Sequence, residues 1–342
     1  MKNNYHIVYI TEFPTFYKTK LFNELEKSCH NLVIYINSLA VKKSRNNDFL
    51  KGNKNFDSIV IDGNGLLRMK SLYSILRNIS YDEIILSGWD HSLYWLVSIF
   101  NSKSKNSLIV ESSYLESSVT GISGLVKRLF LSRISKVYAS GASQRKLVEL
   151  LGYNGKVVIT KGVGVFNYIP QPSYVPRDNV KKFIYVGRFV EVKNLKFLVN
   201  VFNSLPQYEL YLVGFGEQEE ELRAMSNKNV HFLGAIDNAR LSVVYQQMDV
   251  FVLASKSEPW GLVVEEALNN GLPVILSDRV GCAEEIIDEK KGLIFRNNDQ
   301  DSLKEAILKM TSDLTLYNSM RKSISEMDFK EIEQRQVDCY KS

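Results

Sequence analysis

Short, continuously apolar runs recur along the chain and are separated by polar or helix-length segments. In the first half these runs predict strands at 5–10, 32–36, 58–61, 83–87, 108–110, 137–140 and 157–160. In the second half they predict strands at 183–186, 210–213, 230–233, 250–254 and 273–276. Because the runs are continuous rather than alternating, they are typical of parallel strands covered on both faces.

Segments with helical spacing lie between most of these strands. Helices are expected at 17–27, 92–100, 143–151, 195–204, 217–226 and 238–247, with a last helical segment from about residue 313. This alternation indicates an α/β fold with two doubly wound, Rossmann-like domains.

The domain boundary is expected where the periodicity is lost. Residues 167–182 contain Pro170, Pro172 and Pro176 among polar residues, which is typical of a linker. The expected domains are therefore 1–166 and 183–312, and the helical segment 313–342 could cross back to the first domain.

The stretch SEPWGLVVEEALNNGLPV, residues 257–274, predicts a helix between two buried strands. Glu258 lies in the turn before the helix, Gly261 at its entrance, and Gly271 with Pro273 at its end. Ligands of such units bind at the carboxyl ends of strands, where helix N-termini present free N–H groups to anions. Residues 258–263 are therefore expected to face a phosphate-bearing ligand.

The helical phase separates the two adjacent glutamates of this stretch. With Leu262 and Val263 taken as the inward side, about 100° per residue turns Glu266 inward and Glu265 outward. A carboxylate on a buried flank requires a hydrogen-bonding partner, such as a ligand hydroxyl. An ordinary buried salt bridge at Glu266 and a helix-start carboxylate at Glu258 would account for the same residues.

Cationic residues follow the first strand of the second half. Gly187 and Arg188 come directly after it, and Lys193 lies in the turn before the next helix. A guanidinium and an ammonium together suit a diphosphate, because they neutralise the charge that develops on a departing leaving group. Since no cluster of His, Asp and Glu suggests a metal site, the cations here are expected to be protein side chains.

Polar residues also follow two strands of the first half. Asp90 and His91 come after one strand, and Glu111 and Tyr114 come after the next. These four are candidates for contacts with an acceptor. A single histidine such as His91 is more often structural than catalytic.

The net charge of +5 is unevenly distributed. Residues 1–165 contain 22 Lys and Arg against 12 Asp and Glu, whereas the remainder contains 21 against 26. A basic half suggests an anionic partner, although a solvated basic surface has the same composition. Residues 124–136 predict a basic amphipathic helix, which could lie on an anionic membrane or pack on the domain core.

Other composition features suggest a cytoplasmic location. Cys29, Cys282 and Cys339 are far apart and form no metal-binding motif. The first residues do not resemble a signal peptide, and no apolar run reaches the length of a membrane span.

Four segments taken together resemble a known family. FIYVGRFVEVKN (183–194), LVGFGE (212–217), VHFLG (230–234) and SEPWGLVVEEALNNGLPV (257–274) are similar to the retaining nucleotide-sugar glycosyltransferases of family 4, of the bacterial surface-polysaccharide type. The resemblance implies the GT-B fold, in which two Rossmann-like domains face each other across a cleft. It covers about residues 183–300 closely and the first half only loosely.

The resemblance implies a role for each matching residue. Arg188 and Lys193, with Gly187, would hold the donor diphosphate, Glu258 would position the donor sugar, and Glu266 would bind the ribose. Further donor contacts are implied for Pro259, Trp260, Gly261, Leu262, Val263, Gly234 and Ile236. The family transfers hexoses from UDP- or GDP-sugars without a metal or other cofactor, and it retains the anomeric configuration.

The first half departs from the family where TEFPTFYKTKLF replaces a glycine-rich loop and ESSYLES replaces an acceptor-side histidine. The resemblance suggests a saccharide or lipid-linked saccharide acceptor in capsule, O-antigen or lipopolysaccharide synthesis, and a peripheral site at the cytoplasmic face of the bacterial inner membrane.

Three other functions fit parts of the sequence. A sugar-nucleotide epimerase would share the fold, and GFGEQE (214–219) resembles a fragment of an NAD(P)-binding loop of an oxidoreductase but lacks its third glycine. Nucleic-acid binding by the basic half is not supported by any interleaved aromatic and basic motif.

Overall fold

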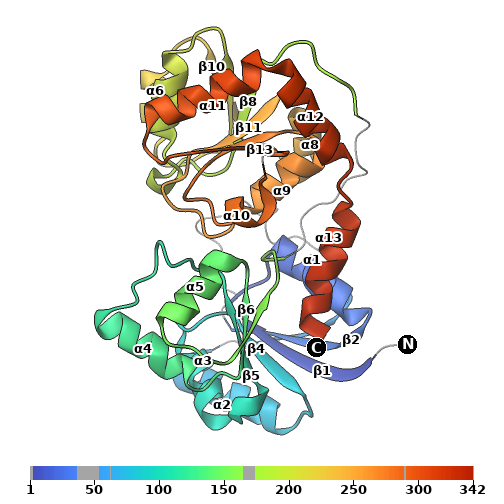
Figure 1. Ribbon diagram of the computed structural model, residues 1–342. Helices are drawn as coiled ribbons and strands as arrows, with labels where there is room; N and C mark the ends of the chain where they lie inside the picture. The colour runs from blue at the N-terminus through green and yellow to red at the C-terminus, as the bar shows by residue number, and fades with distance from the viewer. Residues whose placement is uncertain (1–2, 37–53, 62, 165–173, 289, 342) are drawn as a thin grey trace. The chain divides into compact units, whose positions relative to one another are not determined.

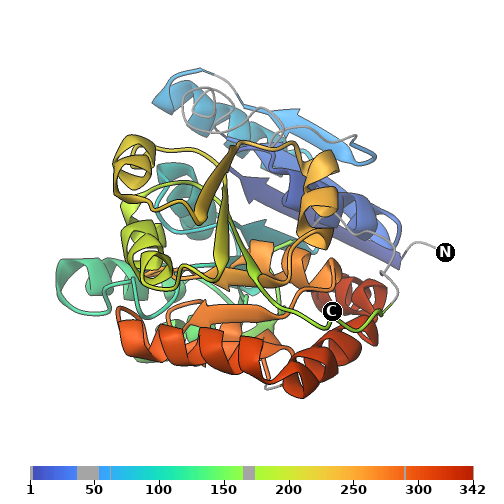
Figure 2. The ribbon, with the colours of Figure 1, turned by 90° about the horizontal axis from the view of Figure 1, so that it is seen from above.

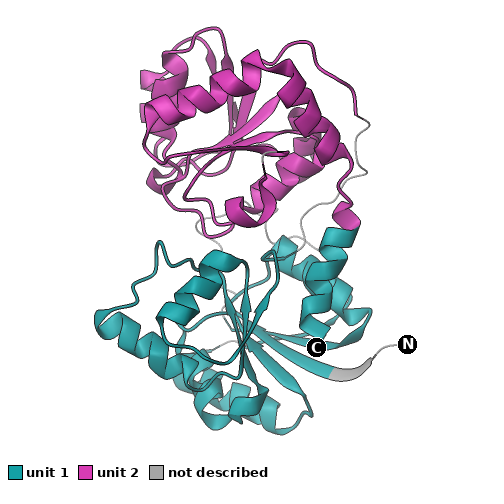
Figure 3. Ribbon diagram, in the orientation of Figure 1, with its two compact units in different colours: residues 1–166, 331–342 teal, residues 167–330 magenta. Residues whose placement is uncertain are grey.

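The computed structural model describes residues 3–36, 54–61, 63–164, 174–288 and 290–341. The chain forms two compact units, one of residues 1–166 with 331–342 and the other of residues 167–330 (Figure 3). Each unit contains one parallel β-sheet with helices packed against it (Figure 1). The expected α/β class with two Rossmann-like units is confirmed.

Unit 1 is built on a seven-stranded parallel sheet in the order β3-β2-β1-β4-β5-β6-β7. The strands are β1 (Asn3–Thr11), β2 (Cys29–Tyr35), β3 (Asp57–Val60), β4 (Glu83–Leu86), β5 (Asn106–Val110), β6 (Lys136–Ala139) and β7 (Lys156–Ile159). The strand order reverses direction between β1 and β4. This reversal is the topological switch point, where ligands bind in open α/β sheets.

The helices of unit 1 contribute to two hydrophobic cores. One core contains residues of α2 (Gly65–Arg77), α3 (Ser92–Phe100), α4 (Gly121–Leu131) and α5 (Ala142–Leu150). The other contains residues of α1 (Phe16–Glu26) and of the C-terminal segment, in which α13 (Phe329–Asp338) is followed by the short helix η5 (Cys339–Lys341). Another short helix, η3 (Lys103–Lys105), precedes β5.

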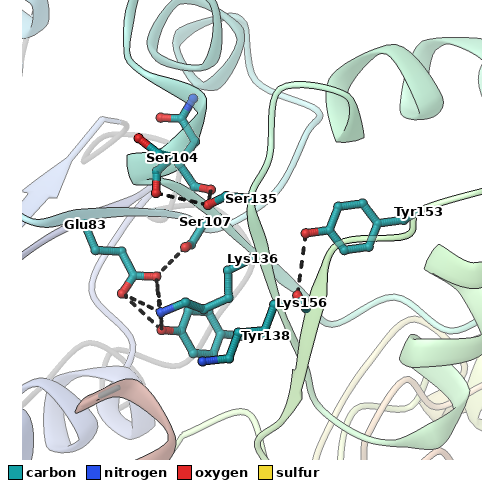
Figure 4. A network of polar contacts seen from close by, with 9 residues as sticks. Glu83, Ser104, Ser107, Ser135, Lys136, Tyr138, Tyr153 and Lys156 are labelled. Carbon is teal, nitrogen blue, oxygen red and sulfur yellow. Dashed lines mark hydrogen bonds and ion pairs between the residues drawn. The ribbon is translucent and has the colours of Figure 1, made fainter.

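A buried polar network ties three strands of unit 1 together (Figure 4). The carboxylate of Glu83 accepts hydrogen bonds from Ser107 and Tyr138 and pairs with the ammonium of Lys136 at 3.1 Å. The ring of Tyr138 stacks on that of Tyr340, with centroids 4.7 Å apart. The network therefore also anchors the C-terminal segment to the sheet.

Unit 2 is built on a six-stranded parallel sheet in the order β10-β9-β8-β11-β12-β13. The strands are β8 (Lys182–Val186), β9 (Glu209–Val213), β10 (Val230–Gly234), β11 (Val250–Leu253), β12 (Val274–Ser277) and β13 (Gly292–Phe295). The order reverses between β8 and β11, whose Phe251 and Ile184 are paired. The switch point of unit 2 therefore lies between these two strands.

Helices α6 to α10 of unit 2 connect consecutive strands, and α11 and α12 follow the last strand. They are α6 (Leu195–Asn203), α7 (Glu219–Met225), α8 (Asn238–Gln246), α9 (Leu262–Asn269), α10 (Ala283–Ile286), α11 (Gln300–Ser312) and α12 (Leu314–Ser325), with the short helix η4 (Glu191–Lys193) before α6. In the view from above, α11 is followed by α12 along one side of this unit (Figure 2). Side chains of α6, α9 and α11 are buried, including Leu198, Leu268 and Ile307.

Several elements differ from the sequence prediction. Strand β13 and helices α2, α10 and α11 were not predicted, and the segment expected from residue 313 to the terminus is two helices, α12 and α13. Residues 313–330 belong to unit 2 and only 331–342 belong to unit 1. Residues 167–173 of the expected linker lie outside the described part of the chain, whereas Val180, in its last part, is buried.

The helix expected at 124–136 is displaced. Helix α4 runs from Gly121 to Leu131, and the last two cations of the expected helix lie beyond it. Arg133 donates to the carbonyl oxygens of Ser98 and Ile99, and Lys136 begins β6 and pairs with Glu83. Turn residues follow α4 directly because β6 must start early enough to pair with β5. No described helix is long and apolar enough to cross a membrane.

Candidate active site

The strongest candidate site lies at the switch point of unit 2. The loop after β8 carries Arg188 and Lys193, and the loop after β11 carries Glu258. Since β8 and β11 are neighbouring parallel strands, the two loops emerge at the same edge of the sheet. The residues predicted from two distant segments are therefore brought together.

The contact between these loops is an ion pair. The ammonium of Lys193 lies against a carboxylate oxygen of Glu258, and the two side chains are only 16% and 14% exposed. A backbone hydrogen bond from Lys256 to the carbonyl oxygen of Val192 joins the same loops, at 2.8 Å. Partial burial strengthens the attraction between the two charges, because less water screens them.

A second polar cluster involves the neighbours of Lys193 in the chain. The carboxylate of Glu191 pairs with the ammonium of Lys256 and accepts a hydrogen bond of 2.7 Å from Gln218. Asn194, with a left-handed φ of 59°, donates to the side chain of Asn298 at 2.8 Å. The sequence analysis did not identify this cluster, whose members come from loops that only the fold brings together.

Arg188 lies at the same edge but is exposed. In the described part of the chain, no ion pair engages its guanidinium. Its carbonyl oxygen accepts a hydrogen bond of 2.9 Å from the hydroxyl of Tyr185. Burial and the nearby Glu258 raise the pKa of Tyr185, whereas Arg188 opposes the shift. Arg188 therefore presents a cation beside the Lys193–Glu258 pair.

The loop that carries Glu258 rests on the turn after β12. Glu258 donates its backbone N–H to Arg279 and accepts from Gly281, at 3.1 and 2.8 Å. A side chain at Gly281 would lie 1.8 Å from the carbonyl oxygen of Pro259, so only glycine fits there. Gly261, the residue before α9, has a φ of 99°, which favours glycine. The loop is thus held by backbone contacts along most of its length.

The expected orientation of the two glutamates of α9 is wrong for Glu265. Glu265 is buried, and its carboxyl accepts a hydrogen bond of 2.9 Å from the indole nitrogen of Trp260, whereas Glu266 is half-buried. The helix packs through Val264 and Leu268 rather than through Leu262 and Val263, which are half-buried. The buried face is therefore rotated relative to the prediction.

The surroundings of Glu265 favour its neutral form. Burial raises its pKa to about 8, the Trp260 hydrogen bond opposes this shift, and neighbouring Glu266 adds to it. The thiol of Cys282 is also buried nearby, and its pKa is raised by burial, by Glu265 and by Glu258. A protonated carboxyl at Glu265 avoids a second buried negative charge beside the site.

The glycines after β9 have a packing function. A side chain at Gly214 would lie 1.8 Å from the carbonyl oxygen of Gly187, and one at Gly216 would lie 2.4 Å from that of Phe189. Phe189 also donates to Phe215 at 2.8 Å. These glycines let two strand-end loops touch, and the following helix α7 begins with three glutamates. Both observations disfavour a dinucleotide-binding loop here.

The residues expected near a nucleotide base lie at the end of β10 and just after it. Gly234, with a φ of 70°, accepts a hydrogen bond from Gly214 at 2.9 Å. Ile236 lines a hollow of about 480 Å³ with Asp237, Arg240 and Val244. Burial raises the pKa of the Tyr245 phenol, and the nearby Glu266 raises it further. The structure thus provides a hollow lined by both apolar and polar side chains, beside the residues expected to contact the base.

The switch point of unit 1 contains an ion pair between Glu111, which the sequence analysis identified, and Lys18, which it did not. Glu111 follows β5, and its carboxylate lies 2.9 Å from the ammonium of Lys18 on α1. Although burial lowers it, the pKa of Lys18 is raised above its ordinary value by Glu111 and by Tyr9. Lys18 was missed because a lysine in an amphipathic helix usually faces solvent.

The other acceptor-side candidates lie on neighbouring loops of unit 1. His91 is the N-cap of α3, and its Nδ1 accepts from the backbone N–H of Leu93 at 3.2 Å. Asp90 is exposed and acts electrostatically on Tyr94. Tyr114 stacks against the ammonium of Lys146, 4.2 Å from its ring centroid. For His91 the structure supports capping, the structural alternative.

No metal site is apparent in what the structure describes. Among those residues, no group of three His, Cys, Asp or Glu side chains is placed to hold an ion.

Comparison with known proteins identifies the second half of the chain. Residues 171–327 match the family model described as Glycosyl transferases group 1. The chain contains a glycosyl transferases group 1 domain. This domain includes the Lys193–Glu258 pair, Arg188 and the whole of α9.

A curated relative is similar to about half of the chain. The chain is 35% identical over 180 residues to the O-antigen biosynthesis glycosyltransferase WbnH of Escherichia coli, which covers 50% of each protein. The chain spans about half the length of the curated relatives it matches first.

Solved structures match over almost the whole chain. Sucrose-phosphate synthase from Thermosynechococcus elongatus has a TM-score of 0.73 at 19% identity, with 99% of this chain and 98% of that chain covered. HepE of Anabaena in complex with UDP has a TM-score of 0.72 at 16% identity, with 98% and 99% covered. These neighbours are GT-B glycosyltransferases, and at such identities the similarity shows the fold alone.

Proposed function

We propose that the protein is a retaining glycosyltransferase that moves a sugar from a nucleotide diphosphate sugar to a saccharide acceptor. The observation that carries this proposal is the Lys193–Glu258 pair beside the exposed Arg188, at the switch point between β8 and β11. Two cations and one carboxylate at one sheet edge match a ligand with a diphosphate and hydroxyl groups.

Each residue has a distinct part in the proposed reaction. Arg188 and Lys193 bind the diphosphate and stabilise the negative charge that grows on it as the bond to the sugar breaks. Glu258 orients Lys193 and accepts hydrogen bonds from sugar hydroxyls. Glu266 binds the ribose, and Gly234 with Ile236 lies beside the base. The loop 259–263 contributes backbone N–H groups at the start of α9.

Retention follows from attack on the same face as the departing diphosphate. The acceptor oxygen bonds to the anomeric carbon, the bond from that carbon to the phosphate oxygen breaks, and the leaving phosphate takes the acceptor proton. Since the two cations neutralise the leaving group, the reaction proceeds without a metal ion. Product anomers determined by NMR and turnover in excess EDTA test these two points separately.

The acceptor belongs to bacterial surface-polysaccharide synthesis. The similarity to WbnH, named for O-antigen biosynthesis, supports this class of acceptor. The acceptor is a saccharide or lipid-linked saccharide in O-antigen, lipopolysaccharide or capsule synthesis. It contacts unit 1 through Glu111, Asp90 and Tyr114, and the enzyme works at the cytoplasmic face of the inner membrane.

A ligand panel tests the proposal directly. We expect UDP, GDP or ADP, or one of their sugar derivatives, to raise the melting temperature of the full chain. UDP is the first choice because the structural neighbour HepE was solved with it. The proposal fails if no nucleotide or nucleotide sugar changes the melting temperature. Product analysis with and without an acceptor distinguishes transfer from epimerisation of the donor.

A further inference from the structure

The turn after β13 contacts both loops of the candidate active site. Residues 296–299 are called the β13 turn. In the sheet order, β13 is the edge strand, and β12 separates it from β11 and β8, whose loops carry the site. The β13 turn nevertheless reaches the loop after each of these two strands, through the side chains of the adjacent residues Asn297 and Asn298. One turn is therefore tied to both strand ends of the site.

Asn297 holds the loop that carries Glu258. Its side-chain nitrogen donates a hydrogen bond of 3.0 Å to the carbonyl oxygen of Ser255, which lies shortly before Glu258 and is fully buried. The hydroxyl of Ser277, at the end of β12, donates to the same carbonyl oxygen at 2.6 Å. The backbone N–H of Asn297 donates to a carboxylate oxygen of Asp278 at 3.1 Å. The start of the loop is thus held by the segments that follow β12 and β13.

Asn298 holds the loop that carries Lys193. Its side-chain oxygen accepts a hydrogen bond of 2.8 Å from the side chain of Asn194, which directly follows Lys193 and is buried. Both asparagines have a left-handed φ of 59°. Residues other than glycine adopt this conformation at a cost, although asparagine tolerates it better than most. The hydrogen bond therefore links two residues in a costly conformation and stabilises both.

The side chains of Asn297 and Asn298 are not needed to cap the helix that follows them. Asp299 is the N-cap of α11 and accepts from the backbone N–H of Ser302 at 2.9 Å, and Arg296 pairs with Asp299 at 2.8 Å. Asn194, before α6, also makes no side-chain hydrogen bond that caps its own helix. All three amide side chains are directed to other loops instead. Contacts between loops, rather than local helix geometry, therefore explain these asparagines.

We infer that Asn297 and Asn298 are positioning residues for the proposed transfer reaction. By holding one loop each, they set the place of the Lys193 ammonium relative to the Glu258 carboxylate. The inference rests on the proposed function for the reaction, but the contacts stand without it. Lys193 and Glu258 are proposed to act as negative charge develops on the departing diphosphate. A shift of this pair should therefore lower turnover more than it weakens nucleotide binding.

Two substitutions of Asn298 separate backbone conformation from hydrogen bonding. Asn298→Gly keeps the left-handed conformation without strain but removes the acceptor, whereas Asn298→Asp keeps both. In the glycine variant we expect kcat to fall about 10-fold and the Kd for UDP to rise less than about 3-fold. Both constants should stay near normal in the aspartate variant. Normal kcat in the glycine variant overturns the inference, as does an equal loss in both variants.

The same isosteric change should have the opposite effect at Asn297. Here the side-chain nitrogen is the donor, so Asn297→Asp places an oxygen against the carbonyl oxygen of Ser255. We expect Asn297→Asp to lower kcat at least as much as Asn297→Ala does. If the turn served stability alone, these variants would melt at a lower temperature with kcat unchanged, and that result overturns the inference.

Hydrogen exchange followed by mass spectrometry tests the contacts without any substrate. The segment 188–198 should exchange at least about 3-fold faster in Asn298→Gly than in the unchanged protein, because its loop loses a contact that limits opening. The segment 254–262 should do the same in Asn297→Asp. Unchanged exchange in both segments overturns the inference. Circular dichroism checks that every variant is folded.

The matched control is Asn203→Ala at the end of α6, near the opposite edge of the sheet. It removes a hydrogen bond of 2.7 Å to the carbonyl oxygen of Met225. This variant should melt at a lower temperature but keep normal kcat, and a loss of kcat as large as that of Asn298→Gly overturns the inference. Thermal stabilisation of the unchanged protein by nucleotides, measured separately, reports on the proposed function alone.

Discussion

The indole nitrogen of Trp260 donates a hydrogen bond of 2.9 Å to the carboxyl of Glu265, and both side chains are buried. Trp260 belongs to the loop that carries Glu258, and Glu265 belongs to the helix that follows it. The backbone of Cys282 also donates to the carbonyl oxygen of Trp260, at 2.9 Å. Glu265 is therefore a positioning residue that fixes the loop through the tryptophan ring.

Glu265→Gln should change how stability depends on pH. The pKa of Glu265 is about 8 in the folded protein, above its ordinary value of 4.5, so the folded state retains a proton that the unfolded state has lost between these values. This contribution is full below pH 4.5 and is lost as pH rises towards 8, with a slope of at most about 1.4 kcal/mol per pH unit. Glutamine cannot titrate, so its variant lacks this slope.

Denaturant unfolding of both proteins from pH 5 to pH 8 measures the effect. The free energy of unfolding of the unchanged protein should fall relative to that of Glu265→Gln as pH rises. A difference that stays constant across this range would show that Glu265 does not titrate there. Glu305→Gln on α11, at an exposed site, serves as the control. The difference in free energy of unfolding between the unchanged protein and this variant should show no such trend with pH.

Glu258→Gln should abolish most activity while the fold persists. The variant keeps the shape of the side chain but loses the charge that orients Lys193. We expect turnover to fall by about 100- to 1,000-fold, the loss typical of one preorganised polar group in an active site. Steady-state kinetics and thermal melting of the same preparations measure both effects. Turnover within a factor of three of normal would remove Glu258 from the site.

Arg188→Ala should weaken binding of nucleoside diphosphates. Its exposed guanidinium is the cation expected to reach the diphosphate, and we expect affinity to fall by about 10- to 100-fold. Arg188→Lys should restore part of it, because it keeps the charge but not the bidentate geometry. Arg223→Ala on α7 is the control. Calorimetry with UDP and with uridine, which lacks the phosphates, measures the effect. The affinity for UDP should fall more than that for uridine, and equal losses for both would contradict a contact between Arg188 and the diphosphate.

Gly214→Ala should destabilise unit 2. A methyl group there would lie 1.8 Å from the carbonyl oxygen of Gly187, and the φ of 137° is unfavourable for alanine. Because backbone must move to relieve the contact, we expect a loss of about 3 kcal/mol or more. Gly65→Ala, where nothing lies within 4 Å, should be close to neutral. Equal stabilities in denaturant unfolding would mean that the two loops do not touch.

His91 should behave as a helix cap. His91→Ala removes the acceptor for the backbone N–H of Leu93 and should cost about 1 kcal/mol of stability. His91→Asn can cap α3 and should restore both stability and turnover. If Asn restores stability but turnover stays at least 10-fold low, the imidazole itself takes part in the reaction. Thermal melting and kinetics on the three proteins separate these outcomes.

The linear pattern was sufficient for much of the candidate active site. Continuous apolar runs predicted twelve of the strands, since a strand covered on both faces is built mostly of apolar residues. Arg188 and Lys193 follow one such run and Glu258 follows another, so the sequence predicted that all three lie in loops after strands. Strand β13, GLIF, was missed because only four residues precede a polar turn.

By itself, the sequence determined the class of fold, the strand ends that carry the candidate site, and the positions where several of the helices begin. Tertiary packing decided the rotation of α9, because only its contacts with the sheet show that Val264 and Leu268 face inward and that Glu265 meets Trp260. Packing likewise decided the partners of the cations in the expected basic helix. Lys127 and Arg128 donate to the segment just before α4, whereas Arg133 and Lys136 are held by partners farther away in the sequence, and no local pattern contains that information.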